Sequence, residues 1–187
     1  MTINGAGMPG YSEKAQPYLD AIGAAVLSSA EVRDWILTGI PGAIPYLGST
    51  PVADEQRAKR GATKQPFWAN YWCGRDSRCT CRIEGSKALE SDAIFFLRNT
   101  EGRTLGLHVE FKHPRETFGY GQPEGYPLRA ACFAKTWAGR KTMLPHEDWA
   151  TVIFCGAEAV SDPRIGSFQR IITHAEARQR IRDYPVV

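Results

Sequence analysis

The sequence predicts a mixed α/β fold in which helices flank a central β-sheet. Segments 91–99 and 104–113 are apolar or alternating, and the short stretch between them contains Gly102, which indicates a hairpin of two antiparallel strands. A continuous apolar run at 149–156 indicates a further strand that is covered on both faces. Apolar residues at helical spacing occur on both sides of these strands, as a layered α/β domain requires.

The first third of the chain is expected to be mostly helical. Residues 1–11 are rich in Gly and small side chains and are expected to form a flexible lead, so that 12–187 makes up a single domain. Apolar spacing over 12–38 predicts one long helix or two short ones before Gly39 and Pro41. A long connection follows, with a short helix expected near 53–60.

The rest of the chain supplies the sheet and its covering helices. Residues 78–84 alternate and predict a first strand, which would complete a three-stranded meander with the hairpin. A helix is expected from about 127 to 138, before the strand at 149–156. A short strand and a terminal helix end the chain, and Thr173 and Glu176 form a capping box at the start of that helix.

Composition excludes several classes of protein. The chain has 187 residues, 43% hydrophobic and 23% charged, which is ordinary for a soluble globular domain. No apolar run approaches the roughly 20 residues that span a bilayer, so no membrane partner is expected. No export signal is recognised, and an odd number of five cysteines then favours reduced thiols in a cytoplasm. Net charge is only +3, yet residues 56–82 hold seven basic residues against one acid.

Charged side chains gather where the predicted hairpin ends. Alternation over 104–113 places Glu110 and Lys112 on one face of the strand, with His108 behind them. The hairpin brings Asp92, at the start of the neighbouring strand, close to the same point. Two converging carboxylates repel unless a cation lies between them, and their hard oxygen atoms suit Mg²⁺ or Mn²⁺.

Asp92, followed by Glu110-Phe111-Lys112, resembles the PD-(D/E)XK nuclease superfamily, whose members have the restriction-endonuclease-like fold. The order helix, three-stranded meander, helix, strand is similar to that family's core. The resemblance implies a metal-dependent nuclease without an organic cofactor. It implies that Asp92, Glu110 and the carbonyl of Phe111 bind the metal, and that Lys112 acts on the attacking water.

Further site residues are implied by the same resemblance. Many members carry a glutamate on the first core helix near the metal, for which Glu31 is the candidate and Glu55 the alternative. RecB-type members carry Gln-x-x-x-Tyr after the catalytic strand, and Gln122 and Tyr126 match it. Prolines 123 and 127 are unfavourable inside a helix, so that helix is expected to begin only near residue 127.

A nucleic acid, with DNA as the expected one, is the partner that such an enzyme requires. Aromatic and basic residues interleave over 64–82, a mixture that suits base stacking and phosphate contact. The rings are expected to pack the start of the sheet. The residues expected to face the nucleic acid are Lys64, Arg75, Arg78 and Arg129. A homodimer or a partner protein is also compatible with so small a chain.

The cysteines and the function leave alternatives open. Cys73, Cys79 and Cys81 could hold Zn²⁺ or part of an iron–sulfur cluster, but no fourth ligand lies nearby in sequence, which favours structural thiols. Cys132 and Cys155 are expected in the core. The rival to a nuclease is a catalytically inactive module of the same fold that binds nucleic acid or another protein.

Overall fold

The computed structural model describes residues 14–61, 64–74, 77–87, 90–135 and 142–186. The predicted flexible lead at 1–11 lies outside these residues. In the described part of the chain, no helix has the length and apolar character needed to cross a membrane.

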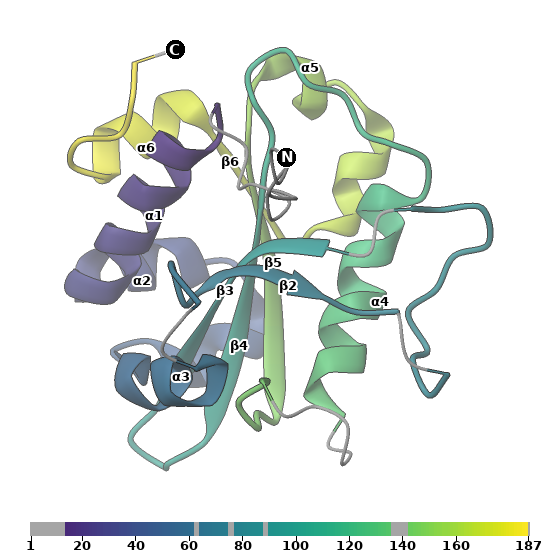
Figure 1. Ribbon diagram of the computed structural model, residues 1–187. Coiled ribbons are helices and arrows are strands. Elements are labelled where there is room, and N and C mark those ends of the chain that lie inside the picture. The colour runs from purple at the N-terminus through teal and green to yellow at the C-terminus, as the bar shows by residue number, and fades with distance from the viewer. Residues whose placement is uncertain (1–13, 62–63, 75–76, 88–89, 136–141, 187) are drawn as a thin grey trace, which may run out of the picture.

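Helices lie on both sides of a mixed β-sheet (Figure 1). The α-helices are α1 (Gln16–Ser28), α2 (Ala30–Leu37), α3 (Ala53–Arg60), α4 (Gln122–Ala134), α5 (Ala157–Val160) and α6 (His174–Arg180). Two short 3₁₀ helices are η1 (Pro41–Tyr46) and η2 (Pro163–Ser167). The predicted mixed α/β class is therefore confirmed.

Six described strands form one sheet in the order β1-β3-β4-β5-β6, with β2 also paired to β3. The strands are β1 (Thr50–Pro51), β2 (Ala69–Trp72), β3 (Glu90–Arg98), β4 (Thr104–Phe111), β5 (Asp148–Cys155) and β6 (Arg170–Thr173). The predicted hairpin is β3 and β4, which are antiparallel. Strand β5 lies parallel to β4, and β6 parallel to β5, so the sheet is mixed.

One strand prediction was wrong. The strand that precedes the hairpin is β2, and residues 78–84 form turns and irregular backbone. Alternation in 78–84 came from Cys79, Cys81 and Ile83, of which Cys79 and Cys81 belong to a cysteine cluster and not to a sheet. Burial of alternate side chains thus produced the period of a strand without strand pairing.

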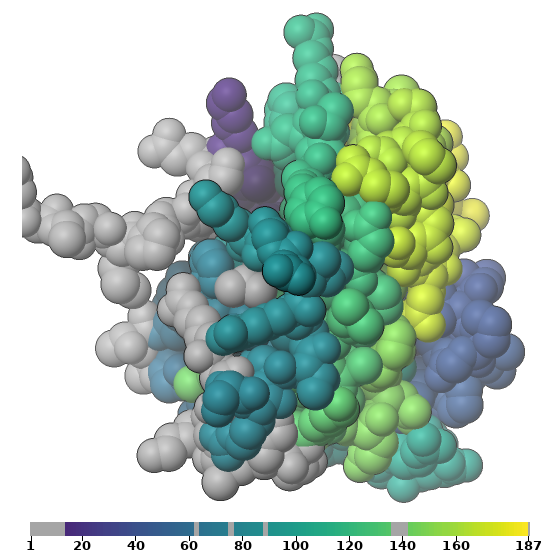
Figure 2. Space-filling model, turned by 90° about the vertical axis from the view of Figure 1, so that its right-hand side faces the viewer, coloured from purple at the N-terminus to yellow at the C-terminus, as the bar shows by residue number. Residues whose placement is uncertain are grey.

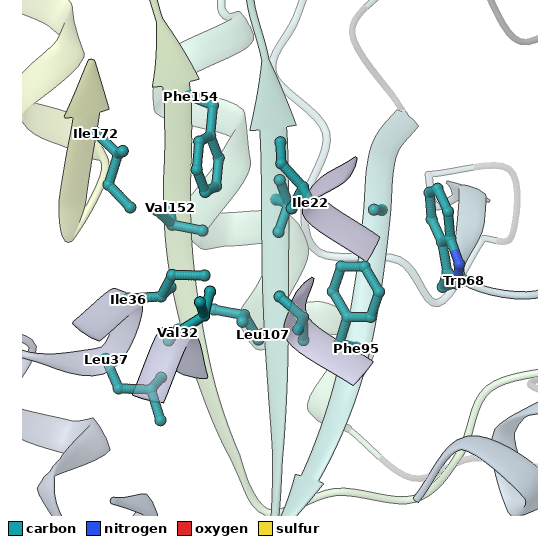
Figure 3. Packing of buried hydrophobic residues seen from close by; sticks show 14 of the residues in the cluster. Ile22, Val32, Ile36, Leu37, Trp68, Phe95, Leu107, Val152, Phe154 and Ile172 are labelled. Atoms are coloured by element: carbon teal, nitrogen blue, oxygen red, sulfur yellow. The ribbon is translucent and has the colours of Figure 1, made fainter. Parts of the chain in front are cut away.

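A large hydrophobic core lies between one face of the sheet and helices α1, α2 and α6. Leu105, Leu107, Val109 and Phe111 all belong to this cluster, which confirms the predicted apolar face of β4. Figure 3 shows part of this layer, with Ile22 of α1 and Ile36 of α2 over the sheet that contains Leu107. Burying a side chain of this size stabilises the fold by about 1.5–3 kcal/mol.

Helix α4 covers the opposite face of the sheet. Phe133 stacks on His108 of β4, with ring centroids 5.7 Å apart. Figure 2 views this side, where the irregular segment 77–87, in teal, lies beside α4, in green. Ser86 Oγ donates a hydrogen bond to the carbonyl of Tyr120, next to the start of α4. The two faces of β4 therefore meet different layers, as its alternation requires.

The residues at the starts of α2 and α4 explain where these two helices begin. The predicted 12–38 helix divides at Ser29, whose hydroxyl accepts a hydrogen bond from Val32 N and caps α2. Helix α4 begins at Gln122, not near 127. Pro123 lies in the first turn, where its missing N–H is not needed, and Gly125 N already donates to Gly121 O.

Candidate functional site

The strand register brings the two predicted carboxylates together. Ala93 pairs with Val109, so the preceding Asp92 lies opposite Glu110. Phe111 N donates a 2.8 Å hydrogen bond to Asp92 Oδ2, which ties the start of β3 to the end of β4. Both carboxylates open into a pocket of about 330 Å³ that is also lined by Lys112 and Gln122. The hairpin geometry that the sequence predicted is thus present in the structure.

Glu110 and Lys112 form an ion pair whose two charged atoms are too far apart for a direct hydrogen bond. Lys112 Nζ lies 3.6 Å from Glu110 Oε1, and the residues are only 9% and 2% exposed, respectively. Gln122 Nε2 donates a 2.7 Å hydrogen bond to the same oxygen, so an amide from α4 orients Glu110. Within the pocket lining, Lys112 is therefore the cation that lies beside these two carboxylates.

The pKa values of the two carboxyl groups reflect above all their burial. Burial raises the pKa of Asp92 well above its usual range, and the nearby Glu110 raises it further. Burial also raises the pKa of Glu110, although the charge of Lys112 acts against this shift. Carboxyl groups whose pKa values are raised resist ionisation, and a bound cation would restore their charged form. Such paired shifts in a pocket are typical of functional sites.

Tyr126 connects α4 to both strands. Its hydroxyl donates to the carbonyl of Val109 at 3.2 Å and accepts from Asp92 N at 3.3 Å. Gln122 and Tyr126 are four residues apart, so they project from one face of α4 toward the end of the hairpin. Both residues predicted from the Gln-x-x-x-Tyr pattern therefore contact the carboxylate site directly or through its backbone.

The backbone of Lys112 is held on both sides. Its amide donates to Phe154 O of β5 at 2.8 Å. Its carbonyl accepts from His174 Nε2 at 2.9 Å, while His174 Nδ1 accepts from the hydroxyl of Tyr184 at 2.8 Å. Burial lowers the pKa of His174, which favours the neutral ring, and the carbonyl of Lys112 requires that Nε2 carry the proton. The lysine thus projects from a fixed position.

The predicted glutamate ligand of the first helix is not brought to this pocket. Glu31 has a side chain that is 86% exposed and lies 3.8 Å from Arg180. Because Ser29 starts a new helix, Glu31 falls in the first turn of α2, whereas the helix that lines the pocket is α1. The alternative, Glu55, forms a two-point ion pair with Arg98 instead.

The predicted nucleic-acid contacts have different outcomes. Arg129 is fully buried, and its guanidinium lies 4.5 Å from the centre of the Tyr126 ring, so the prediction that it contacts nucleic acid was wrong. From inside the fold its charge instead acts against the rise that burial causes in the pKa of Glu110. Lys64 is partly exposed and Arg78 exposed, outside the pocket lining. Arg75 lies outside the described residues.

Several pocket residues were missed by sequence reasoning. Glu90 precedes Asp92 by two residues on β3, so alternation could have found it as a third carboxylate. Trp72 was expected to pack the start of the sheet with the other rings of 64–82, but it is 42% exposed and lines the pocket; Phe67, Trp68 and Tyr71 are buried as predicted. Asn70, also in the lining, has φ of 54°, a left-handed conformation that asparagine tolerates.

Replacing Gly156 by alanine should destabilise the end of β4. A Cβ at Gly156 would lie 2.6 Å from Pro114 O and 2.7 Å from Pro114 Cα, and both are backbone atoms that cannot rotate away. We expect Gly156→Ala to lower the free energy of unfolding by about 1–3 kcal/mol, measured by urea denaturation. The matched control is Gly166→Ala, where a Cβ meets no atom within 4 Å. Equal stabilities of the two variants would contradict this close approach.

Fold and site together define a mixed α/β protein with a cluster of carboxylates and a buried lysine, Lys112, in a pocket at the end of a β-hairpin. Comparisons with models of protein families, with curated proteins and with solved structures found no match to this chain. The site must therefore be interpreted from its own geometry and chemistry.

Proposed function

We propose that this protein is a divalent-metal-dependent nuclease with a restriction-endonuclease-like core, which hydrolyses phosphodiester bonds in DNA. The observation that carries the proposal is the convergence of Asp92, Glu110 and Lys112 in one pocket, with the pKa values of both carboxyl groups raised. In an exposed ion pair the partner's charge lowers the pKa of the carboxylate, whereas here burial outweighs the charge of Lys112.

The donor set fits Mg²⁺ or Mn²⁺. Asp92 and Glu110 supply hard carboxylate oxygens, and Phe111, which also lines the pocket, offers its backbone carbonyl. Such an ion, when bound, lowers the pKa of a coordinated water and neutralises charge at the phosphate. Glu31 has no place in this set, because it is exposed on α2.

The pocket's own charge supports a need for metal. Among the described residues its lining holds four carboxylates, from Glu90, Asp92, Glu110 and Glu116, against two lysines. A pocket of this charge repels an anionic phosphate backbone until cations compensate it. Metal binding would therefore be required for substrate binding as well as for chemistry.

Individual side chains have distinct roles in this proposal. Lys112, whose ammonium faces the pocket beside Glu110, hydrogen-bonds the attacking water and stabilises negative charge that develops on the phosphate oxygens. Gln122 orients Glu110, and Tyr126 holds the β3–β4 end in register. Trp72, exposed at the pocket, offers a ring on which a base can stack. Lys64 and Arg78 are available for phosphate contacts outside it.

Purified protein should cut DNA in the presence of Mg²⁺ or Mn²⁺ and should not cut it in EDTA. Lys112→Ala should reduce the cleavage rate by at least about 100-fold, because the ammonium is expected to act on charge that forms in the transition state. Circular dichroism would check that the fold is kept. Arg180→Ala, at an exposed ion pair, is the matched control and should cut normally.

Cleavage by Lys112→Ala at the wild-type rate would refute the assigned role of the lysine. DNA binding that persists in EDTA, with no cleavage under any divalent metal, would favour the rival function, a catalytically inactive binding module of the same fold.

A further inference from the structure

Four cysteine thiols meet between the irregular segment 77–87 and helix α4. Cys73 follows β2, Cys79 and Cys81 lie in the segment, and Cys132 lies on α4, 51 positions further along the chain than Cys81. Their Sγ atoms all lie within 4.8 Å of one another. Cys132 was expected only as a core residue, and it is buried, but it also provides the fourth thiol that the sequence alone did not reveal.

We propose that Cys73, Cys79, Cys81 and Cys132 hold one Zn²⁺ in a tetrahedral structural site that fastens the 77–87 segment to α4. This site is separate from the carboxylate pocket and does not depend on the nuclease proposal. Soft thiolate ligands in a closed set of four are the donor set that structural zinc prefers.

The sulfur positions fit a single metal ion. Cys73 Sγ lies 3.3 Å from Cys81 Sγ, 3.6 Å from Cys79 Sγ and 3.6 Å from Cys132 Sγ. A disulfide needs about 2.05 Å, so these contacts are too long for S–S bonds. Tetrahedral zinc with Zn–S of about 2.3 Å places its sulfurs about 3.8 Å apart, close to the observed separations. An iron–sulfur cluster distributes its four thiolates over two or four irons, so the four sulfurs cannot all lie as close together as they do around one ion.

Polar groups around the thiols suit a negatively charged centre. Gly74 N donates a 3.3 Å hydrogen bond to Cys79 Sγ, as backbone amides do to metal-bound thiolates. The guanidinium of Arg82 donates to the carbonyl of Gly74. Lys135 Nζ donates a 3.0 Å hydrogen bond to Oγ1 of Thr80, the residue between Cys79 and Cys81 in the sequence. Four thiolates around Zn²⁺ carry a net charge of −2, which these nearby cations offset.

A bound zinc ion would add a strong anchor to the hydrogen bonds that already hold this segment. Residues 77–87 contain neither helix nor strand, and they lie between β2 and β3 in the chain. Ordering an irregular segment costs about 1–2 kcal/mol per residue, and thiol–thiol contacts are weak compensation. A zinc ion bound by Cys132 would tie this segment to the same helix that carries Gln122 and Tyr126 to the carboxylates. The metal would therefore stabilise the support of the pocket.

Metal analysis of the purified full chain tests the proposal without any DNA. Protein produced in zinc-supplemented medium should contain about one zinc per chain, as a closed four-thiolate site binds. Replacing zinc by Co²⁺ should produce the charge-transfer and d–d absorption of tetrahedral cobalt with four thiolates. Cys79→Ser, at a partly exposed position, and Cys132→Ser should each lose most of the zinc, whereas Cys155→Ser, at a buried thiol outside the cluster, should retain it.

Three results would overturn the proposal: wild-type protein without stoichiometric zinc, wild-type protein that contains iron in its place, or a cobalt spectrum without thiolate charge transfer. None of them requires a variant to fold. They are also distinguishable from a failure of the nuclease proposal, because zinc content is independent of cleavage.

Discussion

Asp92→Asn should make the metal-free protein more stable at pH 7 while it abolishes metal-dependent cleavage. The pKa of Asp92 is raised mainly by burial and then by Glu110, so its ionised form destabilises the fold. Asparagine keeps an oxygen for the hydrogen bond from Phe111 N and carries no charge. We expect the free energy of unfolding to rise by about 0.5–2 kcal/mol, which is the gain that single stabilising substitutions commonly give. Cleavage should fall by at least about 100-fold, because losing even a group that only orients a metal ligand costs about 10–100-fold.

The stability gained by Asp92→Asn over wild type should increase as the pH rises. An unfolded aspartate titrates near about 3.9, and the folded state keeps the Asp92 proton to a higher pH. Between these two pKa values the native state binds more protons than the unfolded state, so wild-type stability falls as pH rises. The difference between Asp92→Asn and wild type should therefore be small near pH 4 and should grow toward pH 7.

Urea denaturation from pH 4.5 to 8 measures this difference. Asp54→Asn, at a carboxylate whose side chain is 98% exposed, is the control and should show little change. Added Mg²⁺ should stabilise wild type but not Asp92→Asn, because a ligand that binds only the native state raises its stability. A loss of stability in Asp92→Asn at pH 7 would show that the carboxylate serves an ordinary ion pair.

Arg129→Ala should lower the free energy of unfolding by about 3–5 kcal/mol, as found when one member of a buried charge group is removed. Arg129 is fully buried against Tyr126, and its charge opposes the upward pKa shifts that burial causes in Glu110 and Tyr126. Its removal leaves the carboxylates with less compensating charge and opens a cavity in the support of the site.

Arg129→Met separates the two contributions, because methionine fills much of the volume without the charge. Thermal and urea denaturation followed by circular dichroism would measure both variants. Arg180→Ala, at an exposed pair with Glu31, should cost less than about 1 kcal/mol. A comparably small effect in Arg129→Ala would contradict the proposal that a buried cation supports the carboxylate pair.

Local patterns were sufficient for the central part of the site. Alternation in 104–111 assigned the faces of β4, and a turn containing Gly102 predicted the hairpin, so the sequence alone placed Asp92, Glu110 and Lys112 together. These predictions depend on the two-residue period of a strand and on short-range turn geometry, and both are properties of neighbouring residues. Gln122 and Tyr126 followed from a resemblance, and their contacts with Glu110 and Val109 are visible only in the folded protein.

Long-range packing decided what the patterns could not. Segment 78–84 has the period of a strand, yet its alternate buried residues meet a cysteine of α4 instead of a sheet partner. Arginine is a residue type that usually lies on the surface, yet the packing of α4 against the sheet buries Arg129 beside Tyr126.

The sequence by itself therefore determined the hairpin and the charged residues at its end, because strand period and turn chemistry act over a few residues. Only the tertiary structure decided that Glu31 turns to solvent, that Arg129 is internal and that Cys132 completes a group of four thiols. Each of these depends on where α2 and α4 lie relative to distant segments, and that position is set by packing across the sheet.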